Sequence, residues 1–131
     1  CANLQDLDCY NNQLTHLDVS GCAELQYLTC DENQLSNLNV SGCVNLQYLN
    51  CGYNQLTHLD LSGCSNLQKL YCNNNQITNL NVSGCINLQH LSSHSNQLSI
   101  LATNGSIHIN IGSLYRIVGI VVVYNTSCLE R

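Results

Sequence analysis

Residues 43–63 read CVNLQYLNCGYNQLTHLDLSG, and this stretch recurs along the chain with few changes. The other copies begin at Cys1, Cys22, Cys64 and Cys85, which places one copy every 21 residues. The copy from Cys85 begins to drift, and the register is lost after Gly105. Short tandem copies at a fixed period are typical of solenoids, in which each unit buries its apolar face on its neighbours. The period predicts about five regular coils over residues 1–105, with 106–131 as an irregular terminal coil or capping strands.

Alternation of apolar and polar residues within one copy predicts two short strands in each coil. In residues 48–52, Leu49 and Cys51 point inward, and in residues 57–63, Leu59 and Leu61 do so. Stacked coils pair such segments into parallel β-sheets on both sides of the solenoid, with little or no helix. One glycine in each of the first four coils is expected to close the turn with a positive φ: Gly21, Gly42, Gly63 and Gly84.

Within the third coil, Leu46, Leu49, Cys51, Asn54 and Leu56 form the pattern LxxLxCxxNxL. This pattern resembles the signature of leucine-rich repeat proteins, with Cys where Leu is commonest. The 21-residue length and the NQLTxLDVSGC cadence are similar to the short repeats of bacterial cell-surface members. The resemblance implies an extracellular or cell-surface protein that adheres to or binds other proteins and is not an enzyme.

One asparagine per coil occupies the position of the family's structural Asn ladder. A tight turn leaves buried backbone N–H and C=O groups, and an inward amide can bond both kinds. The predicted ladder consists of Asn12, Asn33, Asn54, Asn75 and Asn96.

The ten cysteines follow the same register, which argues against a metal site. One column holds Cys1, Cys22, Cys43, Cys64 and Cys85, and the other holds Cys9, Cys30, Cys51 and Cys72. Both columns fall at inward positions, where Cys acts as a small buried hydrophobe. Neither the spacing nor the surrounding histidines fit zinc. Buried free thiols are therefore favoured, disulfides across a coil remain an alternative, and no metal or cofactor is expected.

Composition excludes some classes of partner. The net charge is −5, with only three Lys and Arg residues, so no basic patch is available for nucleic acid. No apolar run approaches the ~20 residues of a membrane-spanning helix. Because the sequence contains no Met, we expect a mature chain or a fragment.

Function is sought where the copies differ. Outward positions of the first strand vary between coils while the inward ones stay nearly constant, which favours a binding face for a protein or glycan. We expect Tyr27 and Tyr48 to lie in stacking range there. The predicted face comprises Tyr27, Asp31, Tyr48, Asn50, Lys69, Tyr71 and His90.

The second strand carries other candidate sites. His16 with Asp18, and His58 with Asp60, lack a nucleophile or oxyanion pocket beside them, so solvated pairs are favoured over catalysis. Candidate glycosylation sequons begin at Asn39, Asn81, Asn104 and Asn125.

The two ends suggest a different function. Residues 106–112 and 115–124 are β-prone and are expected to extend or cap the last coil, whereas the edge of the first coil is bare. End-to-end, head-to-tail stacking of coils could build a fibre. The alternative to recognition is therefore a structural subunit of an extracellular fibre or surface layer, carrying glycans.

Overall fold

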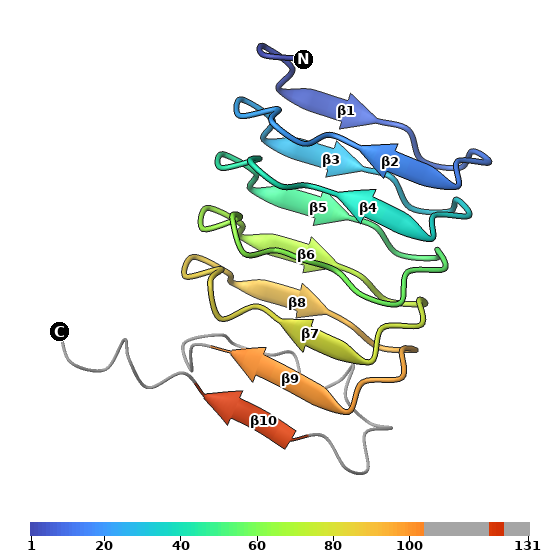
Figure 1. Ribbon diagram of the computed structural model, residues 1–131, viewed down its shortest axis with the longest axis vertical. Coiled ribbons are helices and arrows are strands. Elements are labelled where there is room, and N and C mark those ends of the chain that lie inside the picture. The colour runs from blue at the N-terminus through green and yellow to red at the C-terminus, as the bar shows by residue number, and fades with distance from the viewer. Residues whose placement is uncertain (104–120, 125–131) are drawn as a thin grey trace, which may run out of the picture.

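The computed structural model describes residues 1–103 and 121–124. These residues form a parallel β-solenoid that contains no helix, which confirms the predicted leucine-rich repeat architecture. The coils stack in chain order away from the N-terminus, with one sheet on each side of most coils (Figure 1). The described residues include no helix with the length and hydropathy that a bilayer crossing requires.

The first side is one continuous five-stranded parallel sheet. Its strands, in spatial order, are β1 (Asp6–Asp8), β3 (Tyr27–Thr29), β5 (Tyr48–Asn50), β6 (Lys69–Tyr71) and β8 (His90–Ser92). Pairing is in register with the repeat, so Leu28 lies beside Leu49 and Leu49 beside Leu70. Every strand is three residues long, because the Asn turn begins shortly after it.

The second side carries two separate sheets. One pairs β2 (His16–Asp18) with β4 (Asn37–Asn39). The other has the order β10 (Val121–Tyr124), β9 (Ile100–Thr103) and β7 (Asn79–Asn81). The backbone of β10 pairs in parallel with β9, so this part of the expected cap extends the second side beyond the fifth coil. The expected strand at residues 106–112 lies outside the described residues.

The third coil departs from the sequence-based expectation of a strand at residues 57–63. No strand forms there, and in this described segment no backbone hydrogen bond reaches β4 or β7. The third coil shares every inward residue with the first two coils except Leu61, where they carry Val19 and Val40. Leu61 is buried, longer than valine and not β-branched, and we attribute the unpaired segment to it.

Leucines and cysteines from both sides fill the core. Leu25, Leu28 and Cys30 of the second coil are fully buried, and their third-coil equivalents are too. The same positions in the first coil are only half-buried, because no coil covers them. Burial thus comes from stacking between coils rather than from within one coil.

Backbone conformation at the turns partly contradicts the sequence. Gly21 and Gly42 have positive φ as expected, but Gly63 and Gly84 do not, so those two turns close without the left-handed conformation. A second left-handed position was not anticipated. It precedes each ladder asparagine and is occupied by Asn11, Glu32, Tyr53, Asn74 and Ser95.

Candidate recognition face

The register of the first sheet turns the variable positions into straight columns. One column runs Asp6, Tyr27, Tyr48, Lys69 and His90, and the next runs Asp8, Thr29, Asn50, Tyr71 and Ser92. Six residues of the predicted face lie in these two columns, and Asp31 lies just beyond the end of β3. The structure therefore brings the seven predicted side chains onto one sheet and its C-terminal edge.

The aromatic contact on this face differs from the expected one. Among the described residues, the ring contacts are Tyr48 with Tyr71, at 5.6 Å between centroids, and Tyr71 with His90, at 5.0 Å. Tyr27 joins neither contact, so the expected Tyr27–Tyr48 stack is wrong. Tyr71 lies diagonally between the coils of Tyr48 and His90, and a tyrosine ring reaches its diagonal neighbours. The result is a tilted run of three rings across the third, fourth and fifth coils.

Small and polar residues surround this run. Gly52 is buried, and a Cβ there would lie 3.3 Å from the carbonyl oxygen and the Oδ1 of Asn73. The backbone N–H of Gly52 donates to Oδ1 of Asn50 at 3.2 Å. Burial, then Tyr71 and Asp31, raise the pKa of Tyr48, which keeps its hydroxyl a neutral donor. The rings are thus flanked by amide and hydroxyl groups that can form hydrogen bonds.

The carboxylate of Asp31 is unusual on this face. Its Oδ1 is buried and has no hydrogen-bond partner. Desolvation raises its pKa, and the nearby charges of Glu32 and Asp8 add to the rise. The ionised form of Asp31 is consequently less favourable in the folded chain than in water.

Behind the face, the ladder asparagines join successive coils. Nδ2 of Asn54 donates to the carbonyls of Cys30, Cys51 and Gly52 at 3.0–3.1 Å, and its Oδ1 accepts from the N–H of Leu35 at 2.9 Å. Asn33, Asn75 and Asn96 repeat this pattern. Asn12 is exposed and bonds only the carbonyls of its own coil. The ladder holds the strands of the face in register.

A second amide ladder was missed by the sequence analysis. Nδ2 of Asn45 donates to the carbonyl of Ala23 at 3.0 Å, and Asn66 and Asn87 make the equivalent bonds. The recurrence of Asn two residues after four of the five first-column cysteines was the available signal. Glu24 interrupts this column in the second coil.

The nine cysteines in the described residues are free thiols, and Cys128 lies outside that part. Seven are buried, whereas Cys9 is half-buried and Cys1 is exposed at the first coil. Burial raises the pKa of Cys64 and of Cys72 to about 12, and that of Cys85 to about 11. Buried thiols with such pKa values are protonated and inert at neutral pH. Among the described residues, no group of three metal-ligating side chains could hold an ion.

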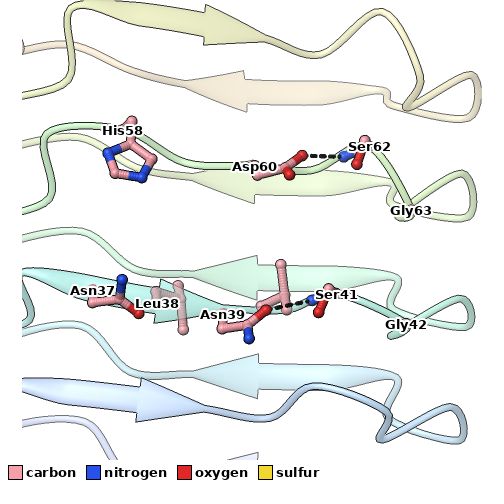
Figure 2. Close-up of a pocket in the computed structure, with 10 residues that line it drawn as sticks. Asn37, Leu38, Asn39, Ser41, Gly42, His58, Asp60, Ser62 and Gly63 are labelled. Atoms are coloured by element: carbon pink, nitrogen blue, oxygen red, sulfur yellow. Dashed lines mark hydrogen bonds between the residues drawn. The ribbon is translucent and has the colours of Figure 1, made fainter.

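A shallow depression of about 290 Å³ lies on the second side, between β4 and the unpaired segment of the third coil (Figure 2). Asn37 and Asn39 face it from β4, and His58 and Asp60 from the third coil. Nδ1 of His58 lies 3.4 Å from the hydroxyl of Thr57, and Asp60 instead accepts from the N–H of Ser62 at 3.0 Å. The depression is therefore a seam between two coils.

The acceptor role of Asp60 explains why either Asp or Asn can occupy this position of the second strand in successive coils. Asp18, Asn39 and Asn81 accept the same bond from the N–H two residues later, at 2.9–3.1 Å. This bond closes an Asx turn, which either side chain can make. Hydrogen bonds from Ser20 and Ser62 lower the pKa of Asp18 and of Asp60. The Asn of both sequons thus has a structural function in the turn, and Asn104 and Asn125 lie outside the described residues.

Family models for leucine-rich repeats agree with this architecture. The family model "Leucine Rich Repeat" matches residues 3–25, and "Leucine Rich repeats (2 copies)" matches residues 44–84. Among solved structures, the chain resembles the functional domain of InlJ from Listeria monocytogenes, described as including a cysteine ladder. That match has 26% identity and a TM-score of 0.38, and it covers 88% of this chain and 38% of that one. No curated protein sequence matches the chain.

The matched segments cover the first, third and fourth coils and the start of the second, and the same register, core and asparagine ladder continue through the remainder of the five coils. The chain therefore has the leucine-rich repeat fold and is similar in sequence to leucine-rich repeat proteins, with cysteines in two columns of its core.

Proposed function

We propose that this chain is a non-enzymatic recognition module, located outside the cell or at its surface, that binds a protein or glycan. Leucine-rich repeat proteins generally bind proteins, which supports recognition in general. The observation that carries the proposal is the run of Tyr48, Tyr71 and His90 on the variable face. These are large, half-exposed side chains on a rigid sheet, and Asn50 and Lys69 beside them offer polar contacts.

The test uses a glycan array and a panel of purified extracellular-matrix proteins as probes. We expect the chain to bind at least one probe, and changing Tyr27, Tyr48 and Tyr71 together to Ser to abolish that binding. Tyr53→Asn is the matched control, because Tyr53 is exposed but lies in the turn, where other coils carry Asn. Circular dichroism checks that each variant is folded. Binding that survives the triple change would contradict the proposal.

The second candidate is the structural subunit of a fibre or surface layer. One observation favours it: Leu4, Leu7, Leu14 and Leu17 at the open end of the first coil are only half-buried, although their equivalents in the second, third and fourth coils are buried. Such an end accepts a further coil. Purified protein that forms filaments, with the triple Tyr variant assembling equally well, would favour this candidate. A monodisperse monomer would contradict it.

Glycosylation at Asn39 and Asn81 remains a proposal attached to this second candidate. Oδ1 of Asn39 accepts from the N–H of Ser41, and the Asn39 side chain also forms a hydrogen bond with Asp18. Intact-mass measurement of protein from its native source tests the proposal. A mass equal to that of the bare chain would contradict it.

A further inference from the structure

Charge is distributed unevenly along the solenoid. Residues 1–68 contain no Lys or Arg, and Lys69 is the first basic side chain. The same stretch holds seven of the eight acidic residues: Asp6, Asp8, Asp18, Glu24, Asp31, Glu32 and Asp60. Asp6 and Asp8 lie on the first sheet itself, and Asp31 and Glu32 follow at its C-terminal edge. All the charged side chains on the first two coils of the recognition face are therefore acidic.

Exposed tyrosines alternate with these carboxylates. Asp6 pairs with Tyr27 across β1 and β3, and the side chain of Tyr27 is 46% exposed. Tyr10 is 53% exposed, and its backbone N–H donates to Oδ1 of Asp8 at 3.3 Å. The adjacent N–H of Asn11 bonds the carbonyl of Asp31, which brings Tyr10 beside the second coil. Two aromatic rings thus flank the carboxylates of Asp6, Asp8 and Asp31.

The carboxylates lack cationic partners in the described part of the chain. Oδ1 of Asp31 is buried without a hydrogen bond, although Asn50 forms a side-chain hydrogen bond with this carboxylate, and the negative charges of Glu32 and Asp8 act on it unfavourably. A cation bound here would relieve this repulsion. It would also gain attraction to the tyrosine faces.

We infer that the face formed by Asp6, Asp8, Asp31, Tyr10 and Tyr27 binds an arginine-bearing, extended peptide segment of a partner protein. Charge complementarity identifies a cationic occupant, and the tyrosines favour Arg over Lys. A planar guanidinium both donates to carboxylates in pairs and stacks on aromatic rings, whereas an ammonium is a compact, strongly hydrated charge. The inference rests on the proposed recognition function and assigns a partner chemistry to one part of that face.

Fluorescence anisotropy with a labelled hexa-arginine peptide tests the inference. We expect the chain to bind hexa-arginine at low salt. Its affinity for hexa-lysine should be several-fold lower. The triple variant D6N/D8N/D31N should lose at least tenfold in affinity for hexa-arginine. It is expected to fold, because Asp31 is unfavourable when ionised. Failure of hexa-arginine to bind the unchanged chain would overturn the inference.

A matched control separates a specific face from general attraction to a negative protein. D18N/E24N/D60N removes the same three charges away from the first sheet, and each change installs the Asn that sister coils carry there. This control should keep its affinity within about twofold. Equal losses in both triple variants would overturn the inference. The variant Y10S/Y27S should lose several-fold in affinity for hexa-arginine. An unchanged affinity in this variant would also overturn the inference.

The outcomes also distinguish this inference from the proposed function. In one outcome, the Tyr27, Tyr48 and Tyr71 variant loses binding to an array or matrix ligand, but hexa-arginine does not bind the unchanged chain. This outcome supports the recognition function and contradicts the arginine site. Hexa-arginine binding that D6N/D8N/D31N and Y10S/Y27S weaken, and that D18N/E24N/D60N leaves unchanged, supports the arginine site, whichever probe the array identifies.

Discussion

Individual side chains on the inside of this solenoid bond to neighbouring coils as much as to their own. Asn54 accepts from Leu35 N–H in the second coil, and it donates to carbonyls of both the second and third coils. Its carboxamide thus satisfies four buried backbone groups at once. Asn12, at the same position in the first coil, satisfies two exposed carbonyls. The same residue type therefore contributes very different stabilisation at the two positions.

We expect Asn54→Ala to lower the free energy of unfolding by about 1–3 kcal/mol, because it leaves buried backbone groups without partners. Asn12→Ala should cost less than about 0.5 kcal/mol, since water reaches the same carbonyls. Urea denaturation of both variants measures the difference. Equal costs would show that the carboxamide does not join the coils.

Tyr53 occupies a left-handed conformation with a φ of 50°. A bulky residue is strained there, whereas Asn, found at this position in the first and fourth coils, tolerates it. Tyr53→Asn should therefore raise the free energy of unfolding by about 0.5–1 kcal/mol. Thermal denaturation checks this, and a lower melting temperature would show that the exposed ring makes a stabilising contact.

At the scale of whole elements, the second side is interrupted at the third coil. Val19 N–H bonds Asn39, and Val82 N–H bonds Ala102, but no such backbone bond starts from Val40 or Leu61. Amide exchange should be faster at Val40 and Leu61 than at Val19 and Val82. Hydrogen exchange followed by NMR measures the four amides. Equal protection would contradict the seam.

Leu61→Val gives the third coil the same inward residues as the first two coils. We expect the variant to pair its second side with β4 and to slow exchange at Val40. The removed methylene costs about 0.5–1.5 kcal/mol of transfer and cavity energy, so global stability need not rise. Unchanged exchange at Val40 would show that a residue other than Leu61 causes the interruption.

These elements show how far sequence reasoning reaches. The 21-residue register predicted the stack, the inward columns and the asparagine ladder, because each depends on a pattern repeated in every coil. The interruption at the third coil, which we attribute to the size of Leu61, and the Tyr48–Tyr71 contact, which depends on ring direction, each rest on one side chain. A change of one methylene leaves the hydrophobic pattern intact, so the pattern carries no signal for it. The expected Tyr27–Tyr48 stack was wrong because a shared column fixes Cα spacing and not ring orientation.

For the whole molecule, buried thiols couple folding to pH. Burial raises the pKa of Cys30, Cys43, Cys51, Cys64, Cys72 and Cys85 in the folded chain. Above the unfolded thiol pKa of about 9, the unfolded chain therefore binds fewer protons than the folded one. Stability is full below that pH and falls as the pH rises through the window up to the folded pKa values.

The expected loss is about 1.4 kcal/mol per pH unit for each buried thiol within that window. Urea denaturation under reducing conditions between pH 8 and pH 10.5 should show a steep fall. The slope of the free energy of unfolding against pH counts the protons released on unfolding. Replacing Cys51 and Cys72 by Ala should lower that number by about two. A free energy of unfolding that does not change with pH would mean that the thiols are exposed to solvent or form disulfides. A pH slope that the double variant leaves unchanged would mean the same.

Because the same hydrogen bonds join each pair of neighbouring coils, such a chain can gain or lose whole repeats during evolution. If recombination between repeats excised residues 43–63, Asn75 would meet Cys30 and Leu35 in the places now held by Cys51 and Leu56. Val40 N–H would then face Asn81 just as Val19 N–H faces Asn39, so the loss would also remove the seam. The shortened protein would present Tyr27 next to Lys69. Gain or loss of one unit thus yields a folded descendant with a new order of surface columns, and diversity of the face can arise without any point mutation.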